Sequence, residues 1–287
     1  MSQEWKGKTR GGLVGHQIFV WSLRNLGLNF CYFLLFWVSF YFVFFSPKTS
    51  VEIYSFYRKT NKFNPIKALF YIWKNYFYLG QTLVDKVAIY IGKKDEFTIV
   101  KPYMEAFNKM LSQDKPIILI TSHIGNFEAA GHLVHIPRRF NLLLYEAELA
   151  QVKVFMETIK MESDISASII KYDGSHVFQL AKVMENKEIL CLHGDRFIEG
   201  SKFLSVEFFG DLARFPYGPF YMANRFETET AFISLIKSGH KEYTLEFHDL
   251  NSAQGAQGIL NNYSKIMEKM VIKYPESWFN YFNFWKK

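Results

Sequence analysis

The sequence predicts an α/β protein with a mixed, mostly parallel central sheet flanked by helices, preceded by an N-terminal membrane helix or helical hairpin. Beyond Lys94, short apolar runs alternate with stretches of helical period. Before Lys94, a long uncharged aromatic segment is followed by basic aromatic helices. We therefore expect three regions, a membrane anchor at 1–50, interfacial helices at 51–94 and an α/β domain at 95–287.

The anchor is predicted from a stretch without charge. No charged residue occurs from Asn25 to Pro47, and residues 30–45 are nearly all apolar or aromatic, which is long enough to span a bilayer. The following Ser-Pro-Lys lacks the small residues of a signal-peptide cleavage site. Bases flank both sides, and glycines at 11, 12, 15 and 27 should break the preceding stretch into short pieces. A half-inserted hairpin therefore competes with a spanning helix, and a buried core helix remains a third interpretation.

The positive charge is concentrated in the N-terminal third of the chain. Residues 46–94 carry nine basic residues against two acidic ones, and residues 1–94 hold 24 of the 53 aromatic residues. Bases interleaved with aromatic rings beside an apolar run favour an anionic membrane surface as the partner. No zinc-finger, helix-turn-helix or RNP pattern accompanies the charge, so nucleic acid is not expected.

The secondary structure is read from periodicity and from turn residues. Helices rich in Tyr, Phe and Lys are expected over 51–92, with a break near Asn64-Pro65. Further along, apolar runs predict strands at 116–121, 141–145, 166–171, 188–193, 229–237 and 243–249. Helices are expected at 126–134, 147–161, 176–186, 218–225 and 258–273, and 206–219 reads as a hairpin leading into a helix. The only cysteines, Cys31 and Cys191, indicate neither a disulfide framework nor a metal knuckle.

The first candidate catalytic motif follows the strand at 116–121 directly. It contains His123, Gly125 and Glu128, and strand ends in open α/β sheets are where ligands and catalytic groups gather. On a regular helix His123 and Glu128 would point about 140° apart. They meet only if His123 lies in a turn before the helix, which Gly125 makes feasible. A carboxylate bonded to one ring nitrogen would then leave the other nitrogen as a base.

The second candidate motif is Gly194-Asp195-Arg196, directly after the strand at 188–193. An acid and an arginine at this place are expected to point into the same cleft as His123. The guanidinium of Arg196 is suited to bidentate binding of a phosphate or another anionic group. A salt-bridged loop arginine is the alternative interpretation.

Taken in order, these motifs resemble the lysophospholipid acyltransferase superfamily, and the likeness is strongest to the bacterial lipid A biosynthesis (lauroyl/myristoyl) acyltransferases. The residues that carry it are His123-x4-Glu128, Gly194-Asp195-Arg196, Phe208-Phe209-Gly210, Ala213, Pro216-x-Gly-Pro219, the ending Tyr274-Pro-Glu-Ser-Trp278, and Phe284-Trp285. The resemblance covers essentially the whole chain. Its one departure is Gly194-Asp195-Arg196, since the family more often has other sequences at this second site.

The resemblance implies a glycerolipid acyltransferase-like fold for 95–287 and an acyl transfer to a lipid hydroxyl. His123 would be the general base, Glu128 its partner, and Arg196, next to Asp195, a contact to an anionic part of the substrate. Acyl-ACP or acyl-CoA would be the donor, and a lipid A precursor or a lysophospholipid the acceptor. No metal or other cofactor is expected. The expected location is the bacterial inner membrane, with the catalytic domain facing the cytoplasm.

The developing oxyanion of an acyl transfer needs preorganised donors. We expect them from the backbone N–H groups of Ile124, Gly125 and Asn126, or from the Asn126 amide.

Two alternative functions remain open at this point. Metal-dependent lipid hydrolysis would use His123, Glu128, His132 and His135, although the zincin pattern His-Glu-x-x-His is absent. A non-catalytic lipid-binding protein at the membrane surface would retain the fold without the reaction. Serine hydrolase and P-loop functions are not indicated, because their motifs are missing.

Overall fold

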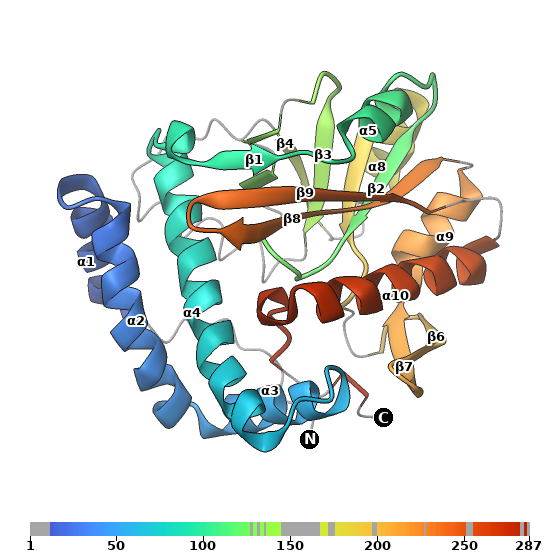
Figure 1. Ribbon diagram of the computed structural model, residues 1–287. Helices are drawn as coiled ribbons and strands as arrows, with labels where there is room; N and C mark the ends of the chain where they lie inside the picture. Colours follow the sequence, from blue (N-terminus) through green and yellow to red (C-terminus); the bar gives the residue numbers. More distant parts are fainter. Residues whose placement is uncertain are drawn as a thin grey trace.

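The protein is built around a seven-stranded sheet with the strand order β1-β9-β8-β2-β5-β3-β4 (Figure 1). The computed structural model describes residues 12–126, 129–130, 133–134, 136–144, 167–171, 176–196, 200–226, 228–250, 255–281 and 284–285. The strands of the seven-stranded sheet are β1 (Thr98–Val100), β2 (Ile117–Thr121), β3 (Phe140–Leu144), β4 (Ala167–Lys171), β5 (Ile189–His193), β8 (Glu229–Gly239) and β9 (Glu242–Asp249). Within this sheet, only β8 and β9 pair antiparallel. The predicted mixed, mostly parallel sheet is confirmed.

The central strands β2 and β5 are short apolar runs that are fully buried, which explains why the sheet forms around them. Every residue of β2 and β5 is buried, as in a parallel sheet covered on both faces. Along β2 the side chains alternate between two apolar cores: Ile118 and Ile120 belong to one, and Ile117 and Leu119 to the other. The sheet is therefore the middle layer of three.

Helices cover both faces of the sheet (Figure 1). They are α1 (Gly12–Asn25), α2 (Leu28–Phe45), α3 (Pro47–Lys59), α4 (Pro65–Tyr90), α5 (Met104–Leu111), α8 (His176–Glu185), α9 (Tyr217–Arg225) and α10 (Gly255–Lys273), with 3-10 turns η1 (Lys94–Glu96) and η3 (Pro275–Ser277). The predicted break before α4 is confirmed, because Asn64 caps the helix by accepting a hydrogen bond from the Lys67 N–H at 2.8 Å.

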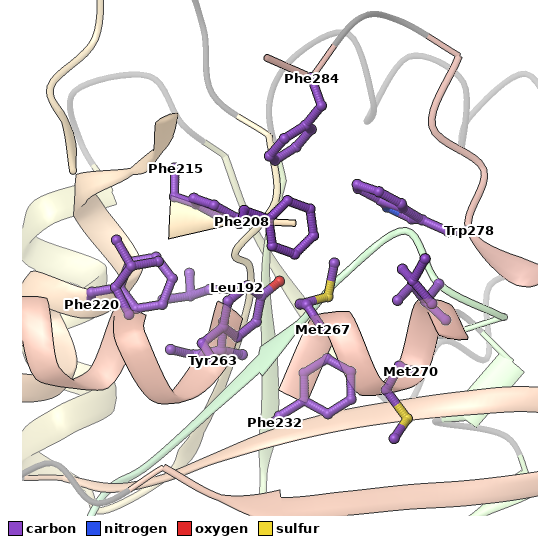
Figure 2. Packing of buried hydrophobic residues seen from close by; sticks show 14 of the residues in the cluster. Leu192, Phe208, Phe215, Phe220, Phe232, Tyr263, Met267, Met270, Trp278 and Phe284 are labelled. Atoms are coloured by element: carbon purple, nitrogen blue, oxygen red, sulfur yellow. The ribbon is translucent and has the colours of Figure 1, made fainter. Parts of the chain in front are cut away.

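The first core lies on the face covered by α8, α9, α10 and a two-stranded hairpin, β6 (Phe203–Phe208) and β7 (Asp211–Pro216). Figure 2 shows the rings of Phe208, Phe215, Phe284 and Trp278 gathered beside α10. Phe208 lies 5.8 Å from Trp278 and 5.5 Å from Phe284, centroid to centroid. This aromatic cluster fixes the C-terminal segment against the hairpin that the sequence predicted.

The N-terminal helices pack on the α/β body. Within α2, Leu28, Cys31, Tyr32 and Leu35 belong to the second core, and Phe42 packs against the first. Contrary to the expectation of short pieces, α1 runs unbroken from Gly12 to Asn25, and the chain reverses at Gly27 with a φ of 84°. One glycine inside a helix costs only about 1 kcal/mol relative to alanine. Among the described residues, α2 is the one helix long and apolar enough to cross a bilayer.

A buried ionic cluster joins α2 and α4 to the sheet. The Asp85 carboxylate accepts hydrogen bonds from Lys237 Nζ at 2.7 Å, from the Tyr243 hydroxyl at 2.5 Å and from the Tyr32 hydroxyl. Burial lowers the pKa of Lys237, while the Asp85 charge opposes that change. A buried carboxylate is tolerated here because its oxygens are paired and hydrogen-bonded.

Some elements differ from the sequence prediction. Strand β1 and helix α5 were not predicted. Strand β1 has only three residues, at the edge of the sheet, which is too short to show an alternation of apolar and polar residues. The helix expected at 147–161 lies outside the described residues, as does part of the one at 126–134.

Candidate active site

His123 and Asp195 lie side by side because the strands before them are adjacent and in register. Strands β2 and β5 pair in parallel, with Thr121 opposite His193, and the two site residues each follow two positions later. His123 Nδ1 lies 2.8 Å from Asp195 Oδ1. The His123 side chain is 17% exposed, so a substrate atom can reach the ring.

Asp195 is held by three hydrogen bonds. In addition to the ring contact, its Oδ2 accepts from the backbone N–H of His123 at 2.9 Å and from Trp278 Nε1 at 3.2 Å. The residue is 2% exposed. Burial alone would raise the pKa of Asp195, but the charge and hydrogen bond of His123 and the charge of Arg196 outweigh it, so the pKa lies well below the usual range. Asp195 is therefore an ionised acceptor that orients the His123 ring.

His193, the last residue of β5, stacks on His123 with ring centroids 4.5 Å apart. It is buried, and burial together with the nearby charge of His123 lowers its pKa well below the ordinary value. The His193 ring is thus neutral at pH 7 and forms one wall of the His123 position.

Two glycines allow the strand-end turns to approach their neighbours. Gly125 has a φ of 78°, and a Cβ there would lie 2.3 Å from the Leu235 carbonyl oxygen. A Cβ on Gly194 would lie 2.6 Å from Ile120 and 2.8 Å from Tyr263. The sharp turn predicted at Gly125 is confirmed, and larger residues at either position would displace the turn that carries His123 or Asp195.

The C-terminal segment clamps the His123 turn. The Gly125 N–H donates to the Ser277 carbonyl at 2.8 Å, and the Phe279 N–H donates to the His123 carbonyl at 3.1 Å. Asn75 of α4 in turn donates to the Trp278 carbonyl at 3.2 Å. The catalytic turn is therefore fixed by segments far apart in sequence.

The oxyanion role expected for residues 124–126 stays a prediction, and the structure shows where these donors are bonded without a substrate. The Gly125 N–H is bonded to Ser277, the Asn126 N–H to the Leu235 carbonyl at 2.7 Å, and the Ile124 N–H to Ser122 Oγ at 3.3 Å. The Asn126 amide is buried and donates to the Thr82 carbonyl at 3.1 Å. These hydrogen bonds hold the turn that carries His123 in place.

Arg196 lies next to Asp195 and is partly exposed. Its Nη2 donates to the Phe279 carbonyl at 2.9 Å, and its charge contributes to the low pKa of Asp195. The predicted contact of Arg196 with an anionic substrate group stays a prediction, although the guanidinium lies in the neighbourhood of His123 as expected.

Glu128, His132 and His135 lie outside the described residues, so the predicted pair of His123 with Glu128 is not tested by the geometry. Within the described part, His123, His193 and Asp195 offer donor atoms within 4.8 Å of one another. The 2.8 Å between His123 Nδ1 and Asp195 Oδ1 is a hydrogen-bond distance. An ion between these two atoms would need about 2.0 Å to each, which this spacing does not favour.

Sequence reasoning did not foresee the contacts of Asp195 with His123 and Trp278 or the stacking of His193 on His123. The predicted contact of Asp195 with the substrate stays a prediction. The strand register offers the missing signal: residues at equal offsets after two adjacent parallel strands meet. Trp278 has no such signal, since it reaches Asp195 from 83 positions away.

The fold and the site together define an α/β enzyme with a histidine–aspartate pair at the carboxyl ends of neighbouring parallel strands. The family model described as "Bacterial lipid A biosynthesis acyltransferase" matches residues 75–287, about three quarters of the chain. The chain belongs to this family, which confirms the resemblance seen in its motifs. Family membership indicates an acyltransferase of lipid A type substrates and a membrane-associated bacterial protein. A comparison with curated proteins gave no match.

Proposed function

We propose that this protein transfers a fatty acyl chain from a thioester, acyl-ACP or acyl-CoA, to a hydroxyl of a membrane lipid acceptor of the lipid A precursor or lysophospholipid type. The observation that carries the proposal is the bond between His123 Nδ1 and the buried Asp195 carboxylate. Family membership supports the reaction class.

In the proposed mechanism, His123 acts as general base. A proton on Nδ1, held by Asp195, leaves Nε2 as the basic nitrogen. Nε2 takes the proton of the acceptor hydroxyl as its oxygen attacks the thioester carbonyl. When the tetrahedral adduct collapses, the C–S bond breaks, the ester bond remains, and the thiolate takes the proton back from His123. No acyl-enzyme forms, and the protonated ring is stabilised by the Asp195 charge.

Two further residues have proposed roles. Glu128, which completes the His-x4-Glu motif, is a second carboxylate for the His123 ring. Arg196 binds an anionic group of the acceptor or donor, because a guanidinium beside the base can hold a phosphate with paired hydrogen bonds. The proposal needs no metal or other cofactor.

The proposed location is the bacterial inner membrane with the active site on the cytoplasmic side. Both candidate donors are thioesters of the cytoplasm, and the lipid acceptor and product remain in the bilayer. Family membership supports a membrane-associated protein.

The direct test is acyl transfer by the purified full-length protein, with labelled acyl-ACP or acyl-CoA and a panel of hydroxylated lipids, read out by lipid mass spectrometry. We expect His123→Ala to abolish transfer while the circular dichroism spectrum stays unchanged. The matched control is His240→Ala, since His240 lies on the β8–β9 connection and hydrogen-bonds Asn29. Full activity of His123→Ala would refute the assignment.

A further inference from the structure

Helix α2 presents two opposite faces. Its buried residues recur at helical spacing and pack on α4 and the α/β body. Six residues of α1 and α2, which we call the aromatic face, are each more than half exposed: Trp21, Phe33, Trp37, Tyr41, Phe44 and Phe45. In α2 the spacing of these residues places them opposite the buried ones. Large aromatic residues exposed together along one helix face are unusual for a protein in water and indicate an interaction site.

We propose that the aromatic face inserts into one leaflet of an anionic membrane while α2 lies along the membrane surface and does not cross it. The inference does not depend on the proposed acyl transfer. It concerns the residues that hold the protein at the bilayer and their depth.

The charge around the face identifies the partner. Residues 12–90 contain eight basic and two acidic residues. Of the acids, Asp85 is buried against Lys237. Of the bases, Lys86 is buried, and Lys59 and Lys74 form ion pairs. Exposed Lys48 and Lys67 adjoin the apolar residues at the α2–α3 junction and at the start of α4. Anionic headgroups complement this charge. A second copy of the chain would instead place like charges against each other.

The packing of α2 excludes a crossing. At about 1.5 Å per residue, its 18 residues reach about 27 Å, close to the thickness of the hydrocarbon core. Yet the α/β body contacts α2 near both ends. At one end Tyr32 binds the Asp85–Lys237 pair, and at the other Phe42 packs on Tyr76, which stacks on Tyr281.

A crossing would therefore draw charged parts of the body to lipid depth. Lys74, two residues before Tyr76 on α4, forms an ion pair with Glu276. The polar turn between β8 and β9 lies beside Tyr32, as the His240 ring contact shows. Ionised groups at the bilayer centre are costly. An orientation along the surface immerses only the aromatic face, with Trp and Tyr at the depth where these residues favour the interface.

The first test is flotation of the purified full-length protein with phosphatidylcholine vesicles, with and without about one third phosphatidylglycerol. We expect binding to the anionic vesicles. In the double variant Trp37→Ser/Phe44→Ser, the loss of two aromatic anchors should weaken binding to these vesicles at least about tenfold. The matched control is Phe178→Ser, because Phe178 on α8 is 82% exposed but lies outside the aromatic face. Equal loss in the control, or no binding of the wild-type protein to the anionic vesicles, would overturn the proposal. A dimer in solution would then identify a second copy as the partner of the aromatic face.

The second test decides whether α2 crosses. Single cysteines Asn29→Cys and Lys48→Cys mark its two ends, in a background where the buried Cys31 and Cys191 are replaced by alanine. An impermeant maleimide is added to spheroplasts or to inside-out membrane vesicles of an expressing bacterium. We expect both positions to react from the same side only. Reaction from opposite sides would show a spanning helix and refute the inference. Acyl transfer measured in detergent micelles is a separate readout, so a failed orientation test and a failed activity test remain distinguishable.

Discussion

The two oxygens of Asp195 bind the ring and the backbone of the same residue, His123. Oδ1 meets Nδ1 at 2.8 Å and Oδ2 meets the backbone N–H at 2.9 Å. This double contact fixes the rotamer of the imidazole relative to its own main chain. It makes Asp195 the described carboxylate best placed to set the tautomer of the base.

We first predict that Asp195→Asn reduces kcat by about 10³-fold or more, because the amide can hold the wrong ring tautomer. Glu128→Gln is expected to have a smaller effect, since the described carboxylate at Nδ1 is Asp195. Single-turnover acyl transfer measures both. Asp211→Asn, at an exposed carboxylate paired with Lys59, is the control. The reverse order of the two effects would assign the orienting role to Glu128.

Trp278→Phe tests the indole hydrogen bond without emptying the aromatic cluster. The substitution removes the Nε1–H that binds Asp195 Oδ2 at 3.2 Å but keeps a ring near Phe208 and Phe284. Loss of one hydrogen bond to a charged group is worth about 1.5–3 kcal/mol. We expect kcat to fall about tenfold or more with KM nearly unchanged. A change in KM alone would indicate a substrate contact instead.

Lys237→Met is predicted to destabilise the protein by about 3–5 kcal/mol, because it leaves the Asp85 carboxylate buried without its cation. Unfolding in denaturant measures the change. The double variant Asp85→Asn/Lys237→Met should recover part of the loss, since it removes the buried charge as well. A double variant no more stable than the single one would show that the pair contributes little beyond packing.

The carboxylate of Glu246 predicts a specific acid sensitivity. Burial opposes its ionisation, but the His248 ring at 3.3 Å and hydrogen bonds from Lys273 and Tyr274 lower the pKa of Glu246 to about 2. A lowered folded-state pKa contributes stability that is complete above the unfolded value, near 4.5, and is lost as the pH falls toward 2. Glu246→Gln should therefore show its largest deficit above pH 5 and approach the wild type as the pH falls toward 2.

The comparison needs unfolding free energies across this range. Glu207→Gln, at an exposed position of β6, should change the curve little. A constant difference between wild type and Glu246→Gln at every pH would contradict the prediction.

The central strands and the position of the site could be predicted from sequence. Fully buried parallel strands are continuous apolar runs, and β2 and β5 begin and end within a residue of their predicted limits. The placement of His123 and Asp195 just beyond these strands follows from the same runs.

The partnership of His123 and Asp195 could not be predicted in the same way, because it depends on which strands are neighbours. Strand order is set by contacts between distant segments, and no local pattern states that β5 lies beside β2. Lys237 shows the same limit. A lysine near the end of an apolar strand is usually exposed, and only the packing of α4 on the sheet reveals that it is buried beside Asp85.

The ionic cluster at Asp85 bears on how the protein can be made soluble. Tyr32 enters the cluster from α2, and the Tyr243 hydroxyl lies 3.4 Å from the Asn126 amide, three residues after His123. Deleting the first 46 residues would remove Tyr32 and uncover one side of the second core, so a shortened chain should aggregate. Replacing exposed residues such as Trp37 and Phe44 with polar ones leaves Tyr32 in place and the second core covered. It is the better route to a detergent-free enzyme.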